Sequence, residues 1–306
     1  LRHLSFASKP GAQLSILDDD DEVLAAGRAE SALSSVDVGN LAGDGKGSDD
    51  ALIPLIDAIA DSDSLASVEL HHCELGLATG DLVARILHGD ARSDVAQLAT
   101  ISVAHNNMHA SGMKRLARAL TGNQVLTSLN VSGNHGGEEG VGHLCKALES
   151  TQVTRLNLSL NDGSVGGTKA LQELLQLDRL QVLDFSYNGV GWRHGNALIA
   201  TCGEASSLRE LALSGNGLTD IVHDGVMSLL RSHPNLRILR LPNNQIGTRT
   251  TQGIIAEMNN RSQLTHVQVE PGSIAKEDVT EALWKLNFKR CRMASVAVPP
   301  PPGQPK

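Results

Sequence analysis

The sequence predicts an α/β solenoid, a stack of repeats that each contain one strand and one helix. A nine-residue pattern, L-x-x-L-x-L-x-x-N with an apolar residue at its start, recurs every 27 to 33 residues. Each copy is followed by a glycine-rich turn and then by the apolar spacing of one helix face. A unit of this size cannot bury its apolar face alone, so regular repetition indicates neighbours stacked into a continuous core.

The nine-residue pattern predicts the strands. Its starting residues are Leu1, Leu33, Leu65, Leu98, Leu126, Val153, Leu180, Leu208, Leu236 and Leu264. In the copy that starts at Val153, Leu156 and Leu158 are expected to face the core, whereas Asn157 and Ser159 are expected to face outward. We therefore expect about ten parallel strands on a concave face, with the third, fifth and seventh residues of each copy exposed there.

The segments between the strands predict helices on the convex face. Apolar residues at helical spacing occupy Gly167–Leu175, and the same arrangement recurs around Val141–Leu148, Val226–Leu230 and Ile254–Met258. A helix in every return segment indicates the long variety of repeat.

The asparagine that ends the pattern is expected to be structural. Six consecutive copies carry it, at Asn106, Asn134, Asn161, Asn188, Asn216 and Asn244. Its amide can bond to backbone groups of adjoining turns that would otherwise be buried without partners. A residue repeated in register performs the same packing task each time, so a catalytic role is disfavoured. Cys73 occupies this position in the copy at Leu65.

These units of about 28 residues, with strand, glycine turn and helix, resemble the ribonuclease-inhibitor-like leucine-rich repeat family. The resemblance runs from Leu1 to about Phe288. It implies a non-catalytic module that holds a protein partner on its concave face, and members of the family include GTPase-activating and inhibitory proteins. The first three units depart from the pattern because they are longer and lack the asparagine, so their register is the least determined.

The domain organisation is predicted to be one elongated solenoid over residues 1–288, ending in a capping helix at about 275–288. Residues 289–306 are basic and then proline-rich, as expected of a disordered tail. Because the sequence starts on a repeat with no polar cap before Leu1, we expect residues upstream of it.

Composition restricts the classes of partner that the chain can bind and the cellular compartment in which it is expected. The net charge of −8 disfavours nucleic acid, and no apolar run is long enough to span a membrane. The four cysteines are far apart, which indicates reduced thiols and a cytoplasmic protein, with the nucleus and the cytoskeleton as alternatives. The acidic run at residues 18–22 is interpreted as a solvated loop, since it lacks the glycine bend of a calcium loop.

No catalytic motif is found, so the chain is predicted to be neither an enzyme nor a cofactor-binding protein. The serines at the seventh position have no histidine in the neighbouring columns and no G-x-S-x-G elbow. The weak candidate for a metal site is His72 with His105, at equivalent positions of adjacent copies, and Glu69 as a further ligand. Two surface histidines without a metal remain the favoured interpretation.

The candidate partner surface combines apolar residues with arginines on the concave side, because interface anchors favour tyrosine and arginine. Its residues are Leu160, Val182, Tyr187, Arg209, Arg237, Ile238, Arg240 and Asn243. An ordinary surface with isolated apolar residues is an equal alternative. The first functional hypothesis is a scaffold that binds protein partners, alone or within a larger assembly. The second is a regulator of a partner enzyme, of the GTPase-activating or inhibitor type, and the least favoured is an enzyme in its own right.

Overall fold

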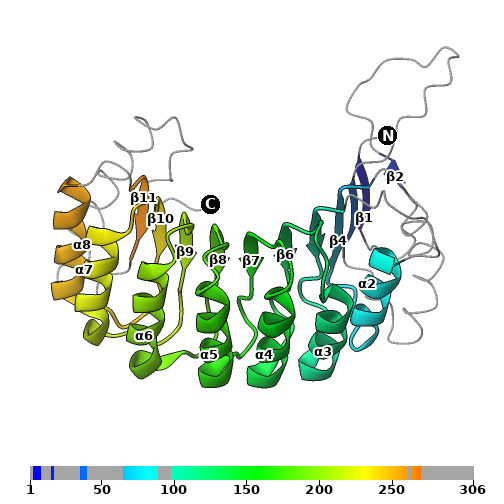
Figure 1. The fold of residues 1–306 in the computed structure, drawn as a ribbon, viewed down its shortest axis with the longest axis horizontal. Helices are drawn as coiled ribbons and strands as arrows, with labels where there is room; N and C mark the ends of the chain where they lie inside the picture. Colours follow the sequence, from blue (N-terminus) through cyan, green and yellow to red (C-terminus); the bar gives the residue numbers. More distant parts are fainter. Residues whose placement is uncertain are drawn as a thin grey trace, which may run out of the picture. The chain divides into compact units, whose positions relative to one another are not determined.

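The computed structural model describes residues 3–7, 15–16, 35–39, 65–88, 98–260 and 264–269 of the 306-residue chain. The expected capping helix at about 275–288, the tail and the acidic run at 18–22 lie outside these residues. The chain forms two compact units, Leu1–Val153 and Thr154–Lys306. Each unit alternates strands with helices, and its helices lie along one side of its strands (Figure 1). We call the opposite side the strand face.

In the first unit the strands lie in the order β2-β1-β3-β4-β5-β6. All pairs are parallel except β1 with β2, which is antiparallel. The strands are β1 (His3–Ala7), β2 (Ser15–Ile16), β3 (Ser35–Gly39), β4 (Ser67–His71), β5 (Thr100–Ser102) and β6 (Ser128–Asn130). The helices are α2 (Ala78–His88), α3 (His109–Leu120) and α4 (Gly137–Leu148).

In the second unit five strands follow one another in chain order. They are β7 (Arg155–Asn157), β8 (Val182–Asp184), β9 (Glu210–Ala212), β10 (Ile238–Arg240) and β11 (His266–Gln268), all paired in parallel. The helical segments are α5 (Ser164–Leu175), α6 (Gly191–Glu204), the 3-10 turn η1 (Asp220–Val222), α7 (His223–Ser232) and α8 (Thr248–Asn260).

The prediction of an α/β leucine-rich solenoid is confirmed. Every predicted copy coincides with a strand, and the register is the one that the repeat spacing requires, since Leu4 pairs with Val36 and Val36 with Val68. The strand β2 was not predicted, because it lies inside a long unit whose sequence does not follow the pattern. Among the described residues, no helix combines the length and apolar character needed to cross a bilayer.

The core consists of the inward strand residues and the apolar helix faces. Leu156, Leu158 and Phe185 are each at most 1% exposed, as the strand pattern predicts. Cys73, Cys145 and Cys202 are buried and are not in disulfide bonds. Burial raises the pKa of Cys202 to about 12, because the interior disfavours the thiolate, so this thiol is protonated at neutral pH.

The prediction for the seventh position is wrong for its four serines. Ser132, Ser159, Ser186 and Ser214 are only 5–9% exposed and do not form an open surface. The strands β6, β7 and β8 end at the fifth residue, whose side-chain oxygen accepts a hydrogen bond from the N–H of the seventh. Asn157 Oδ1 lies 3.0 Å from Ser159 N, and Asp184 Oδ1 lies 2.9 Å from Ser186 N. This Asx turn ends the outward alternation and tucks the serine into the bend.

Candidate functional site

The buried asparagines connect successive repeats within each unit. Asn134 Oδ1 accepts a hydrogen bond from the backbone N–H of Asn106 at 2.9 Å, and its Nδ2 donates to the carbonyls of Val103 and Val131 at 2.9 Å. Asn188 bonds in the same way to Gly163 and Leu158. Among the described residues no buried side-chain nitrogen or oxygen lacks a hydrogen-bond partner. The asparagines are therefore occupied by the backbone and are not available to a ligand.

The residue just before each asparagine, and before Cys73 in the copy at Leu65, has an unusual backbone conformation. It adopts a left-handed conformation, with φ between 52° and 67°, at His72, His105, Gly133, Leu160, Tyr187, Gly215 and Asn243. We call this row the rim. Left-handed φ is uncommon for bulky side chains, and here the regular turn imposes it in copy after copy. Rim side chains at Leu160 and Tyr187 are 44% and 42% exposed.

The tyrosine of the rim is held in a fixed position. Its ring lies over Gly215, where an added methyl group would overlap the ring atoms. Its hydroxyl accepts a hydrogen bond from Nδ2 of Asn243, two repeats further along the chain. Tyr187 is therefore solvent-accessible yet braced from two sides.

Only part of the predicted partner surface comes together. Leu160, Tyr187 and Asn243 all lie on the rim of the second unit. Val182 and Ile238 are both half-buried on the strand face, but each pairs with Glu210, which stands between them. Neighbouring strands are about 4.8 Å apart, so the two apolar side chains are roughly 10 Å apart and form no continuous patch.

The three predicted arginines also divide into two groups. Arg240 lies on the strand face, where its guanidinium is 3.6 Å from the carboxylate of Glu210. Arg209 and Arg237 are exposed at the second position of their copies, before the strands begin. Six residues of nearly extended chain, about 20 Å, separate that position from the rim. These two side chains therefore lie at the opposite end of the strands from Tyr187.

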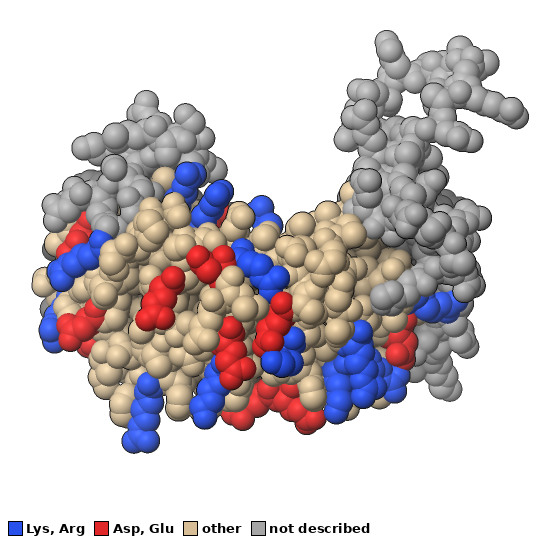
Figure 2. All heavy atoms as spheres, in the orientation of Figure 1, with Lys and Arg blue, Asp and Glu red and all other residues tan. Residues whose placement is uncertain are grey.

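Asp184 Oδ1, one strand before Glu210, accepts the Ser186 N–H of the Asx turn. Near Arg240, the pKa of His266 is lowered, first because burial disfavours the imidazolium and then because the guanidinium repels it. Basic and acidic side chains are interspersed on the face shown in Figure 2.

The weak zinc candidate does not have the geometry of a metal site. The rings of His72 and His105 are stacked, with centroids 4.4 Å apart and planes within 2° of parallel. Their nitrogen lone pairs lie in these parallel planes and do not converge on one ion. The pKa of His105 is lowered from its usual value. The main cause is burial, which disfavours the charged imidazolium, and the second is repulsion by the neighbouring His72.

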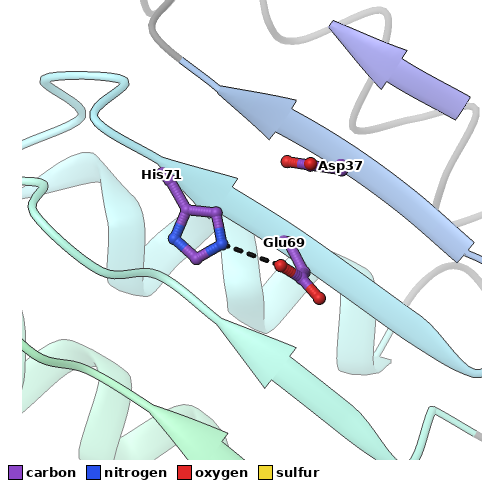
Figure 3. A group of neighbouring side chains, drawn as sticks. All are labelled: Asp37, Glu69 and His71. Carbon is purple, nitrogen blue, oxygen red and sulfur yellow. Dashed lines mark hydrogen bonds and ion pairs between the residues drawn. The ribbon is translucent and has the colours of Figure 1, made fainter. Parts of the chain in front are cut away.

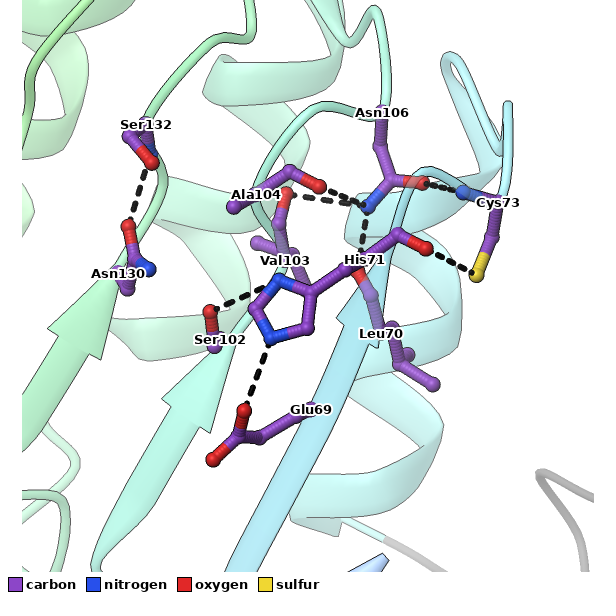
Figure 4. Close-up of polar contacts among 10 residues, drawn as sticks. All are labelled: Glu69, Leu70, His71, Cys73, Ser102, Val103, Ala104, Asn106, Asn130 and Ser132. Carbon is purple, nitrogen blue, oxygen red and sulfur yellow. Dashed lines mark hydrogen bonds and ion pairs between the residues drawn. The ribbon is translucent and has the colours of Figure 1, made fainter. Parts of the chain in front are cut away.

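The structure instead brings together Asp37, Glu69 and His71 in the first unit (Figure 3). Glu69, which was expected to lie with His72 and His105, contacts His71 instead. The fifth and seventh positions of adjacent copies contain the signal that was missed, because Asp37 pairs directly with Glu69 across β3 and β4. Ser102 also lies near His71, so one histidine joins a serine and a glutamate (Figure 4).

That serine–histidine–glutamate chain lacks the features of a catalytic triad. Ser102 is 5% exposed, and its Oγ is 3.5 Å from Nδ1 of His71, at the outer limit of a hydrogen bond. Glu69 contacts Nε2, so the nitrogens are exchanged relative to the usual arrangement. A buried hydroxyl at this distance is suited to orienting the imidazole and is poorly placed to attack a substrate.

Comparisons with known proteins agree with the fold. A leucine-rich repeat family model matches residues 122–145 and 204–221. Ribonuclease inhibitor of Sus scrofa is 32% identical over 173 residues, which are 54% of this chain and 38% of that protein. NACHT, LRR and PYD domains-containing protein 12 of Homo sapiens is 31% identical over 60% of this chain and 18% of that protein.

This chain thus spans well under half the length of these relatives. Among solved structures, the tropomodulin C-terminal domain of Caenorhabditis elegans has 18% identity and a TM-score of 0.36, covering 60% of this chain and 97% of that domain. The fold is that of a leucine-rich repeat solenoid. Its repeats are similar in sequence to those of the proteins named ribonuclease inhibitor.

Proposed function

We propose that this chain is a non-catalytic protein-binding module and that its partner contacts the rim of the second unit at Tyr187. The single observation that supports this most directly is a large aromatic side chain that is 42% exposed and yet braced by Gly215 and Asn243. A side chain already held in one position loses little conformational freedom on binding, so more of its contact energy contributes to affinity.

The surroundings of Tyr187 suit a protein partner. Leu160, on the rim one repeat earlier, adds apolar surface that is 44% exposed. On the strand face of the same unit, Arg240 and Glu210 supply charged groups of both signs at 39% and 33% side-chain exposure. An apolar anchor beside partly exposed polar groups is the usual anatomy of a protein interface. Tyr187 and Leu160 are the anchor residues of this proposal, and Arg240 contributes at its edge.

The test combines crosslinking with affinity measurements. A photoreactive phenylalanine analogue is placed at position 187 or, as a matched control, at position 192. Trp192 is 43% exposed but lies at the start of α6, on the helix side. Proteins that crosslink from position 187 and not from position 192 are identified by mass spectrometry, and the leading partner is then purified.

Tyr187→Ala combined with Arg240→Glu should weaken binding of that partner by at least about 2 kcal/mol, the usual threshold of an interface hot spot. Trp192→Ala and Lys169→Glu, on the helices α6 and α5, should leave affinity unchanged. Equal loss from the helix-side changes, or none from the double variant, would move the interface away from the rim. Circular dichroism of all variants checks that the fold persists.

The second candidate is a regulator of a partner enzyme, acting as an inhibitor by covering the enzyme's surface. The specific observation in its favour is the similarity to proteins named ribonuclease inhibitor over 54% of this chain. Adding the purified protein in excess to a ribonuclease and following cleavage of a fluorogenic RNA tests this role. Unchanged cleavage would remove ribonucleases from the candidate partners while leaving the rim proposal standing.

A further inference from the structure

We propose that Asp37, Glu69 and His71 form a zinc site on the strand face of the first unit. The three side chains come from two adjacent parallel strands, β3 and β4. Asp37 and Glu69 are direct cross-strand partners, and His71 lies two residues beyond Glu69 on the same face. In Figure 3 the histidine and the glutamate extend from β4 on the side where Asp37 extends from β3.

The ligand atoms are close enough to share one ion. One nitrogen or oxygen from each residue lies within 4.8 Å of the other two, and Nε2 of His71 is 2.9 Å from Oε2 of Glu69. Zinc bonds of about 2.0–2.2 Å in tetrahedral geometry place neighbouring ligand atoms roughly 3.4 Å apart. One observed separation, 2.9 Å, is already below that value and the others are at most 4.8 Å, so side-chain rotation can close the site without moving the strands.

The charges of the site also favour a cation. Two carboxylates stand opposite each other across the strand pair, an arrangement that is destabilising unless it is compensated. Among the described residues, the only ion-pair partner of Glu69 is His71, and no lysine or arginine pairs with either carboxylate. A divalent ion would neutralise both carboxylates, and a mixed nitrogen and oxygen ligand set matches the preferences of zinc.

The orientation of His71 is set from the adjacent strand. Ser102 of β5 places its Oγ 3.5 Å from Nδ1, on the side of the ring away from Glu69 (Figure 4). In metal sites, a partner on the second ring nitrogen fixes the tautomer and aims the other nitrogen at the ion. When zinc replaces the Nε2 proton, the imidazole proton resides on Nδ1 and is donated to Ser102. Ser102 is therefore a positioning residue.

The site is accessible to solvent. The side chains of His71 and Glu69 are 26% and 45% exposed, and Asp37 is half-buried. Three protein ligands leave at least one coordination position for water or for an acceptor group of another molecule. This site lies in the first unit and is independent of the partner surface proposed for the second.

The test uses the whole chain after dialysis against a chelator, titrated with zinc chloride by calorimetry and followed by thermal unfolding. One zinc per chain should bind and raise the unfolding midpoint. His71→Gln and Asp37→Asn should each weaken binding at least about 100-fold, and Ser102→Ala by about 10-fold. His72→Gln is the matched control, because this neighbouring exposed histidine belongs to the stack and should bind zinc as the unchanged protein does.

Cobalt(II) substitution gives a readout that does not depend on stability, since coordination by His71 should produce visible absorption bands that His71→Gln abolishes. Absence of zinc binding would overturn the proposal. So would binding that survives His71→Gln, or binding lost in His72→Gln, which would assign the ion to the stacked histidines. Tighter binding of calcium than of zinc, unaffected by His71→Gln, would indicate a carboxylate-only site and also overturn it.

Discussion

At the scale of single residues, the same position in every repeat has the same energetic role. Each buried asparagine satisfies backbone N–H groups of the preceding repeat and carbonyls of two repeats at once. Removing the amide leaves these backbone groups buried without partners, which costs about 1–3 kcal/mol for each group. The amide therefore makes neighbouring repeats interdependent, even though it is not a site for a ligand.

Asn188→Ala should destabilise the second unit by about 3 kcal/mol or more. The change removes the acceptor of the Gly163 N–H, at 3.0 Å, and the donor to the Leu158 carbonyl, at 2.9 Å. Chemical denaturation monitored by circular dichroism measures the free energy of unfolding. Asn196→Ala, on the exposed side of α6, is the control and should change it by less than about 0.5 kcal/mol. Similar losses of stability in both variants would show that the buried asparagine contributes no more than an exposed one.

The stack of His72 and His105 should make stability depend on pH. The pKa of His105 lies below the value of 6.5 expected in the unfolded chain, because burial and His72 disfavour its charged form. Between these two values the unfolded chain binds more protons, so the stabilisation is complete above pH 6.5 and is lost as pH falls toward the folded-state pKa.

The unfolding midpoint should therefore fall between about pH 7 and pH 5 by more in the unchanged protein than in His105→Gln. His194→Gln, which removes a histidine from α6, serves as the control and should not flatten the pH profile. A direct NMR titration of the imidazole protons of His105 complements the melting curves. A measured value at or above 6.5 would contradict the argument.

At the scale of elements, short strands and closely packed helices explain why the repeats can be so compact. Asx turns end β7 and β8 after the fifth residue, at Asn157 and Asp184. Helices then approach closely where glycine allows it. At Gly80 of α2, an added Cβ would lie 2.5 Å from Cβ of Arg115 and 2.6 Å from the backbone nitrogen of Leu116 in α3. The backbone leaves no room for that atom.

Gly80→Ala should destabilise the first unit by about 1–3 kcal/mol, because the two helices must move apart to admit the methyl group. Gly142→Ala is the matched control in α4, where an added Cβ meets nothing within 4 Å. There the change should stabilise by about 0.5–1 kcal/mol, since alanine is the better helix former. Denaturant titrations of both variants measure the free energy of unfolding, which should fall in Gly80→Ala and rise in Gly142→Ala. Equal changes would contradict the close packing of α2 and α3.

At the scale of the whole molecule, the stability of a solenoid is approximately a sum of repeat and neighbour terms, so a defect in one repeat weakens its contacts on both sides. The side chain of the fourth residue of each copy faces the core and packs between the neighbouring repeats. Leu211 of β9 is fully buried, and its strand pairs with β8 and with β10. A charge at this position interrupts the core of the second unit.

Leu211→Asp should cost more than about 4 kcal/mol and broaden or split the unfolding transition, because an unpaired carboxylate is placed in the core. Arg209→Asp introduces the same group two residues earlier, at an exposed position, and should have a small effect. Calorimetry resolves both midpoint and cooperativity. An unchanged transition in Leu211→Asp would mean that the assignment of inward residues is wrong.

The sequence alone was sufficient for the strands, the helices and the core, because these depend on periodic burial. Leu156 and Phe185 face inward as the alternation predicts, and the helix residues Leu144 and Cys145 are fully buried. The rim residues Leu160 and Tyr187 were also identified as exposed from position alone. Repetition makes such predictions strong, since each copy tests the same assignment again.

Only the tertiary structure determined the features that depend on contacts between side chains of different repeats. Asx turns bend the chain at Ser132, Ser159 and Ser186, which are buried, and β2 pairs with β1 from within an irregular segment. The histidine stack and the cluster of Asp37, Glu69 and His71 depend on which side chains meet across strands, at distances of a few ångströms. Periodicity places a residue on a face, but only the packed structure fixes which atoms of neighbouring copies come within reach of one another.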